Sequence, residues 1–391
     1  MNLKKIEERV LELCPYVKEI EVVLQDDAPF ARIRPNFEAL KSAHIINIES
    51  EIRWYGIELY NMEVKDFEKI KGYELFSQER TPQQEIPEPE DELYQILKSF
   101  VSALSDAQVS ASAHLELDLG LDSLDYVELF TFVEESFGVP MDEAVFSEIM
   151  NLGALYAYIK KHRKHSNPVK IDWEKILAEP TDEKLLYSPL IMFAYKTVLL
   201  PLFKLYFRLE CGGKENIPRS ACIFAPSHQS MLDGFLIEAS LPYKVLKNSF
   251  FLAYEAVFGT KFLRPVSDHG QTLLIDADKN LKRSMLRAAL PLREGKNLVI
   301  FPEGARSRDR KLLEFRPFFA MLSKTYNVPI VPVVLDGSYE ALSAGKLFPR
   351  PKKIRIKFLE PIYPENLSYD AMSAKVKDAI DKDMKLHPLS V

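Results

Sequence analysis

The stretch ACIFAPSHQSMLDGF, residues 221–235, opens as an apolar run, meets a proline and then turns polar. Short apolar runs ended by proline or glycine are typical of buried strands in an α/β sheet. Two more runs of this kind follow, KNLVIFPEG at 296–304 and NVPIVPVVLDG at 327–337. These runs predict an α/β domain over residues 185–391.

A histidine and an aspartate follow the first run. His228 comes directly after the predicted strand, and Asp233 lies five residues on, in the first residues of a predicted helix. A turn between strand and helix can bring the two side chains together. A histidine can act as general base when a carboxylate holds its other ring nitrogen and fixes its tautomer. The pair alone leaves a structural histidine as the alternative.

A basic turn follows the second run. Glu303 and Gly304 open it, and Ser307 lies among four cations, Arg306, Arg308, Arg310 and Lys311. Such a turn suits a phosphate, because the arginine guanidinium offers two parallel N–H donors. A solvated basic loop is the alternative for these residues.

In chain order, His-x-x-x-x-Asp, Phe-Pro-Glu-Gly-x-Arg-Ser and Val-Pro-Val resemble the phospholipid/glycerol acyltransferase family, which includes lysophosphatidic acid acyltransferases, over about residues 185–365. The resemblance implies that His228 is the base and that Asp233 orients it. It also implies that a phosphate-bearing acceptor binds to Glu303, Gly304, Arg306 and Ser307.

The chain departs from that family at one place. Where the family has an apolar run ending in an arginine that helps to hold glycerol phosphate, this chain has Asp276 and Ala277, and Lys279 is the nearest cation. The resemblance therefore still implies acyl transfer, but the identity of the acceptor stays open.

The charge of the chain is unevenly distributed. Residues 85–150 contain sixteen Asp or Glu and one Lys, a net of −15, which leaves +9 on the rest of a chain whose net charge is −6. An acidic module inside a basic chain indicates separate domains. Apolar periodicity predicts helices in this module within DELYQILKSFVSAL, SLDYVELFTFVEESFG and MNLGALYAYIKKH.

Ser123 lies at the start of the second of these helices, between Asp122 and Leu124. Read locally, it is a helix-capping serine. The Asp-Ser-Leu sequence in an acidic helical segment resembles the acyl carrier protein family over residues 88–163. The resemblance implies a four-helix bundle with 4′-phosphopantetheine attached to Ser123, and an acyl group carried on its thiol. A degenerate, unmodified carrier fold is the alternative.

The amino-terminal segment, residues 1–85, is predicted to be a small α/β unit. A helix is expected in NLKKIEERVLELC, strands in EIEVVLQ and FARIR, and more helix over 36–60. The segment resembles the C-terminal subdomain of adenylate-forming acyl synthetases. Such subdomains use a lysine near their end, whereas here no lysine occurs between Lys71 and Lys98. It is interpreted as a remnant, a docking module or half of a split synthetase.

The location is inferred from cysteines and apolar runs. Three widely spaced cysteines fit a reducing compartment, and the amino terminus shows no apolar signal region. The run LIMFAYKTVLLPLF at 190–203 is short for a membrane span and contains Lys196 and Pro201. An interfacial or re-entrant hairpin is expected, with a core helix as the alternative. The expected place is cytoplasmic, peripheral or monotopic at the inner face of the cell membrane.

The sequence thus predicts a multidomain protein: an α/β subdomain (1–85), an acyl carrier bundle (88–163) and a glycerolipid acyltransferase domain (185–391). The expected reaction moves a fatty acyl group from acyl carrier or coenzyme A to a lipid hydroxyl, first of all that of 1-acylglycerol-3-phosphate. No metal, nucleotide or nucleic acid is expected to take part. The alternatives are a non-catalytic carrier and docking scaffold for a separate acyl synthetase, or transfer to a lipid without phosphate. A hydrolase is not expected, because the sequence contains no G-x-S-x-G elbow.

Overall fold

The structure is a computed structural model. It describes residues 2–387 except 26–27, 44, 46, 66, 77–86, 106, 142–144, 146–148, 170–171, 180, 182, 260–263, 276–280, 308–309, 344–347 and 365–366. The chain divides into two compact units, residues 1–172 with 277–282, and residues 173–276 with 283–391.

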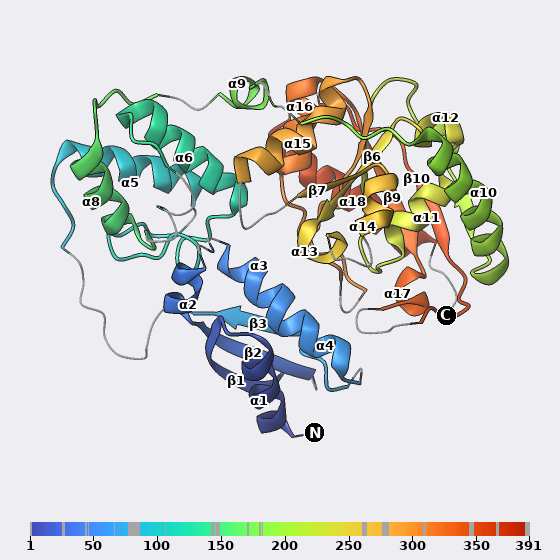
Figure 1. Cartoon of the computed structure of the whole chain (residues 1–391), viewed down its shortest axis with the longest axis horizontal. Coiled ribbons are helices and arrows are strands. Elements are labelled where there is room, and N and C mark those ends of the chain that lie inside the picture. The colour runs from blue at the N-terminus through green and yellow to red at the C-terminus, as the bar shows by residue number, and fades with distance from the viewer. Residues whose placement is uncertain are drawn as a thin grey trace. The chain divides into compact units, whose positions relative to one another are not determined.

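The amino-terminal part of the first unit contains a three-stranded sheet, whose strands are labelled in Figure 1. β1 (Val17–Gln25) pairs antiparallel with β2 (Ala28–Pro35), which pairs parallel with β3 (Gly72–Leu75). The predicted helix and both predicted strands are confirmed. The helices of this part pack a shared apolar core against the sheet; they are α1 (Leu3–Leu13), α2 (Phe37–Ser42), α3 (Ile48–Ile52), the π-helix η1 (Arg53–Glu58) and α4 (Leu59–Glu63).

The acidic segment of the first unit is helical, as predicted. It contains α5 (Glu92–Leu104), α6 (Ser123–Phe137) and α8 (Leu152–His162). α6 begins with a capping box, in which the side chains of Asp122 and Asp125 each accept an N–H of the other residue's backbone, and it ends at Gly138 with φ +66°. The fourth helix of the expected bundle is untested, since most of residues 142–148 lies outside the described residues.

The second unit is built on a seven-stranded sheet in the order β4-β10-β9-β5-β8-β6-β7. Figure 1 labels β6, β7, β9 and β10 of this sheet. The five strands from β9 to β7 run parallel, and β10 pairs antiparallel with β9. All three predicted strands are present, as β5, β8 and β9. The strands are β4 (Glu210–Gly212), β5 (Ile223–Pro226), β6 (Ser249–Tyr254), β7 (Thr272–Ile275), β8 (Asn297–Val299), β9 (Ile330–Asp336) and β10 (Arg355–Phe358).

Helices cover both faces of this sheet. α10 (Pro189–Tyr206) and α11 (Asp233–Ser240) share a core with every second residue of β9, Val331, Val333 and Leu335. α16 (Phe318–Tyr326) and α18 (Tyr369–Leu386) pack on β5 and β9 from the opposite side. The other helices of the unit are α9 (Trp173–Leu177), η2 (Lys214–Asn216), α12 (Tyr243–Leu246), α13 (Glu255–Phe258), α14 (Arg264–His269), α15 (Leu281–Arg293) and α17 (Ser338–Ala341).

The apolar run 190–203 forms one continuous helix, α10, so the expected hairpin is wrong. Lys196 fixes the helix to α11 by donating from Nζ to the carbonyls of Ala239 (2.9 Å) and Leu241 (2.6 Å). Only 11% of this 18-residue helix is buried, which also contradicts a core helix. By length and composition alone, α10 could cross a membrane.

Candidate active site

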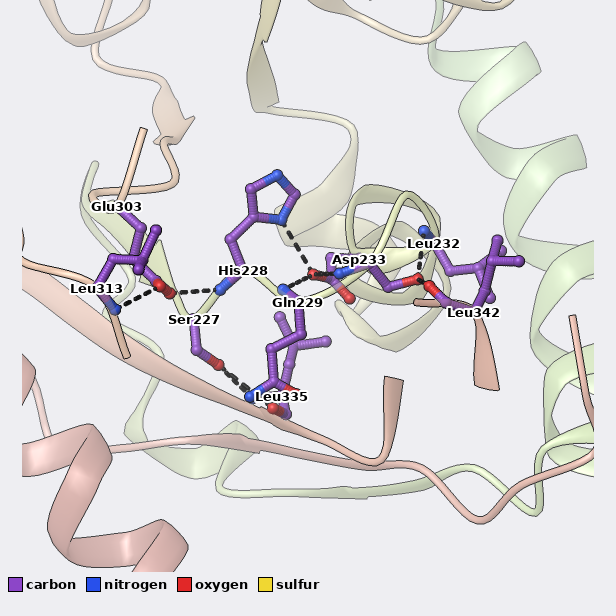
Figure 2. Close-up of polar contacts among 10 residues, drawn as sticks. Ser227, His228, Gln229, Leu232, Asp233, Glu303, Leu313, Leu335 and Leu342 are labelled. Carbon is purple, nitrogen blue, oxygen red and sulfur yellow. Dashed lines mark hydrogen bonds and ion pairs between the residues drawn. The ribbon is translucent and has the colours of Figure 1, made fainter. Parts of the chain in front are cut away.

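His228 and Asp233 are in contact at the carboxyl end of β5 (Figure 2). The strand ends at Pro226, and α11 begins at Asp233, so the turn between them folds the two side chains together. The distance from His228 Nδ1 to Asp233 Oδ2 is 3.0 Å. A carboxylate only accepts hydrogen bonds, so Nδ1 carries the proton and Nε2 is left with a lone pair. This is the tautomer that a histidine base requires.

The position of Asp233 is set by the turn itself. Its Oδ2 also accepts the backbone N–H groups of Gln229 (2.7 Å) and Ser230 (2.8 Å). Asp233 is fully buried, whereas the side chain of His228 remains 20% exposed. The carboxylate is therefore held away from solvent while the ring that it orients can still be reached.

Two serines anchor the same turn to β9 and the segment after it; Figure 2 labels Ser227 and its partner Leu335. Ser227 Oγ lies 3.0 Å from the backbone nitrogen of Leu335, whose N–H it accepts. Ser230 Oγ donates to the carbonyl of Leu342 at 2.7 Å. Both serines are buried, so the backbone on one side of His228 is tied to the neighbouring strand and the backbone on the other side to the residue that ends α17.

Glu303 joins this turn to the segment after β8, the strand beside β5. Its Oε1 accepts the backbone N–H of His228 (2.7 Å), and its Oε2 accepts that of Leu313 (2.9 Å) (Figure 2). The backbone N–H of Ser307 donates in turn to the carbonyl of His228 at 2.8 Å. Burial raises the pKa of Glu303 to about 8. The two N–H donors favour the carboxylate and lower the pKa, but the effect of burial is larger.

The remaining residues expected at the acceptor site are near His228 but differ in exposure. Gly304 is exposed, with φ +61°, at a turn where its N–H donates to the carbonyl of Phe301. Arg306 and Ser307 are buried, at 6% and 1% exposed. Arg310 forms an ion pair with Glu340. Asp276, Ala277, Lys279 and Arg308 lie outside the described residues.

Two residues at the site are absent from the sequence prediction. The ring of Phe301 stacks on that of His228, with centroids 4.1 Å apart. Arg316 lies against Gly304, since a Cβ placed on this glycine would be 3.5 Å from Arg316 Nε. Phe301 belongs to the same Phe-Pro-Glu-Gly motif and could have been found there. No sequence pattern marks Arg316, because the fold alone brings it back to the turn.

Ser123, the residue expected to carry the prosthetic arm, is the first residue of α6, where the helix dipole favours a negative group. A phosphate ester on Ser123 suits this end of the helix. Asp125 lies in the same turn, and burial, together with the charge of Asp122, raises its pKa to about 7. Among the described residues, no group of three or more His, Cys, Asp or Glu side chains is placed to hold a metal ion.

Two protein families match the chain. A family described as Acyltransferase matches residues 208–336, and one described as Phosphopantetheine attachment site matches residues 91–159. The chain is 38% identical over 74 residues to an acyl carrier protein of Thermotoga maritima, covering 18% of this chain and 91% of that protein.

Other similarities are to proteins named as acyltransferases. The chain is 29% identical over 185 residues to a 1-acyl-sn-glycerol-3-phosphate acyltransferase of Limnanthes douglasii. That match covers 46% of this chain and spans 64% of the relative. A crystal structure of the 1-acyl-sn-glycerophosphate acyltransferase of Thermotoga maritima matches with a TM-score of 0.43 and 22% identity, covering 53% of this chain and 90% of that structure.

Proposed function

Because the chain belongs to the acyl carrier protein family over residues 91–159 and carries an acyltransferase domain over 208–336, we propose that it moves a fatty acyl group from a phosphopantetheine thioester to a lipid hydroxyl. The acceptor that we infer is 1-acylglycerol-3-phosphate, as the names of similar proteins suggest. The observation that carries this proposal is the 3.0 Å contact between His228 Nδ1 and Asp233 Oδ2, which leaves Nε2 unprotonated.

His228 acts as the general base in this reaction. Its Nε2 accepts the proton of the acceptor hydroxyl as that oxygen attacks the thioester carbonyl. A carbon–oxygen bond forms, the carbon–sulfur bond breaks, and the proton passes from His228 to the departing sulfur. While the ring of His228 holds this proton it is positively charged, and Asp233 stabilises that charge. General-base assistance of this kind is worth about 10²–10⁴-fold in rate.

We assign the acceptor phosphate to the turn over 303–307. Arg306 and Ser307 lie in it, and Arg316 reaches it from outside by lying against Gly304. A charge-assisted hydrogen bond is worth about 1.5–3 kcal/mol, and a guanidinium can make two to one phosphate. We assign Glu303 a positioning role, because both of its oxygens already accept backbone N–H groups.

We assign the attachment of 4′-phosphopantetheine to Ser123. When bound, this group supplies the thiol on which the acyl chain is carried. Residues 88–163 then deliver the acyl group to a catalytic domain of the same chain. A flexible tether provides an effective donor concentration of about millimolar, so free donor need not be abundant. Coenzyme A thioesters have the same reactive end and are an alternative donor.

We place the second unit at a membrane surface, through α10. Leu190, Phe193, Val198, Leu202 and Leu205 are all more than half exposed along this helix. Phe348 is also exposed, and its neighbour Pro349 accepts a hydrogen bond from Tyr206 at the end of α10. Apolar side chains arranged in this way insert among lipid acyl chains. An inner-leaflet seat would bring the site close to a lipid acceptor.

Acyl release from the loaded protein tests the proposal. Adding a lysophosphatidate to chain loaded with a radiolabelled acyl group should yield a labelled two-chain product. A carrier scaffold for a separate synthetase would keep its acyl group until another enzyme is added. Transfer to a lipid without phosphate would appear as label on that lipid instead.

A further inference from the structure

The loop before Ser123 contacts the amino-terminal part of the first unit through the side chain of Glu116. Glu116 Oε2 accepts the backbone N–H of Ile48 (2.9 Å), and its Oε1 accepts that of Glu49 (2.8 Å). These two N–H groups begin a run of helical turns, α3, η1 and α4, that continues to Glu63. A carboxylate at this position satisfies two N–H groups that have no partner within the helix, and it meets the positive end of the helix dipole.

A second contact lies beside the first. The ring of His114 packs against that of Phe37, with centroids 5.5 Å apart and an interplanar angle of 40°. His114 is buried, and burial lowers its pKa to about 4, so the ring is neutral at pH 7. Its Nδ1 accepts the N–H groups of Glu116 (3.3 Å) and Leu117 (3.2 Å). One imidazole therefore fills the contact and shapes the loop that carries Glu116.

The same loop is tied internally up to the start of α6. The carbonyl of Glu116 accepts the N–H of Gly120 (2.9 Å), and the carbonyl of Leu115 accepts that of Leu121 (3.1 Å). Asp122, the N-cap of α6, follows directly. A short, hydrogen-bonded loop therefore connects Glu116 to Asp122, the residue before Ser123.

From these contacts we propose that residues 2–76 are the resident docking partner of the carrier segment, held to its serine loop by Glu116 and His114. This assigns a role to the segment that resembles a synthetase subdomain. What this docking means for delivery of an acyl group rests on the proposed attachment of 4′-phosphopantetheine. The docking contact itself does not depend on that attachment.

Hydrogen–deuterium exchange on the full, unmodified chain tests this proposal. In Glu116→Ala, the amides of Ile48 and Glu49 should exchange about 10- to 100-fold faster, the range expected for losing a charge-assisted hydrogen bond. In Glu116→Gln, the exchange rates of these two amides should lie between those of the wild type and Glu116→Ala, because one side-chain oxygen remains as acceptor. Glu90→Ala, which removes an exposed carboxylate just before α5, is the matched control and should leave these amides unchanged.

Docking also predicts an effect from the other side of the contact. Phe37→Ala should speed exchange in residues 114–121, although Phe37 makes no hydrogen bond to that loop. If residues 114–121 exchanged in Phe37→Ala as they do in the wild type, Glu116 would be only a local helix cap, and the proposal would be overturned. Wild-type exchange at Ile48 and Glu49 in Glu116→Ala would overturn it as well. Neither readout involves acyl transfer, so failure here would leave the proposed function standing.

Discussion

The backbone N–H of His228 donates a 2.7 Å hydrogen bond to Glu303, a residue 75 positions away in the chain. The two residues follow β5 and β8, parallel neighbours whose carboxyl ends meet at one edge of the sheet. Ligands of open α/β sheets bind at this edge. The motif that contains His228 and the motif that contains Glu303 are therefore joined at this edge by a hydrogen bond.

Glu303→Gln should lower kcat by about tenfold or more and change the KM for the acceptor little. The amide keeps one acceptor oxygen but turns an N–H₂ group toward the second N–H donor, so the turn that holds His228 loosens. Steady-state kinetics with varied acceptor separates the two parameters. A raised KM with unchanged kcat would show instead that Glu303 contacts the acceptor.

His228→Ala should lower kcat by about 10²–10⁴-fold, the usual worth of a general base. Asp233→Asn should also lower it heavily, because an amide no longer fixes the Nδ1–H tautomer. His162→Ala, at an exposed position at the end of α8, is the control and should retain full rate. Circular dichroism and thermal melts check that each variant is folded. Near-wild-type turnover of folded His228→Ala would make the histidine structural.

Arg306→Ala and Arg316→Ala should each weaken the use of a phosphorylated acceptor more than that of its dephosphorylated analogue. The lysine variants should recover only part of the loss, because an ammonium cannot reproduce the guanidinium fork. Arg219→Ala is a matched control, since this exposed arginine precedes β5 at the opposite end of the strand from His228. Equal losses on both acceptors would mean that these arginines support the fold or the donor.

Glu238→Gln should flatten the pH dependence of stability. Glu238 is buried in α11, and burial raises its pKa to about 8. Between its ordinary pKa and that value, the unfolded chain releases this proton while the folded chain keeps it. Stability therefore falls as pH rises through this window, by at most about 1.4 kcal/mol per pH unit for one group.

Urea titrations of the wild type and of Glu238→Gln between pH 5 and 8.5 measure this slope. Comparing slopes cancels any constant cost of placing an amide in the core. Glu294→Gln, at an exposed position after α15, should leave the slope as it is. Identical slopes in wild type and Glu238→Gln would show that Glu238 is ionised in the folded protein at neutral pH.

Much of the fold could be predicted because its signals are local. The apolar runs that became β5, β8 and β9 are bounded by proline or glycine, and the apolar periodicity of the acidic segment marks α5, α6 and α8. β10 gave no such signal. Its four residues alternate in burial, too briefly to show a period, and the strand is defined by pairing with β9.

The site could be predicted from the sequence only where the interacting side chains belong to the same short motif. His228 and Asp233 are close in sequence, so a turn suffices to join them. Glu303 accepts its hydrogen bond from the backbone N–H of His228. Every residue but proline has such a group, so no sequence motif can show which one Glu303 will contact. Arg316 reaches Gly304 only through the fold. Glu303, which the motif led us to expect at the acceptor site, instead accepts the backbone N–H groups of His228 and Leu313.

The most direct test of the central claim is a single-turnover transfer from the loaded chain. Phosphopantetheinyl transferase and an acylated coenzyme A would load Ser123, with intact mass confirming one added arm that Ser123→Ala lacks. On addition of lysophosphatidate, the wild type should pass its acyl group to the lipid, whereas loaded His228→Ala should retain it. The account would be contradicted if the loaded wild type kept its acyl group in the presence of a verified acceptor but transferred it when a separate enzyme was added.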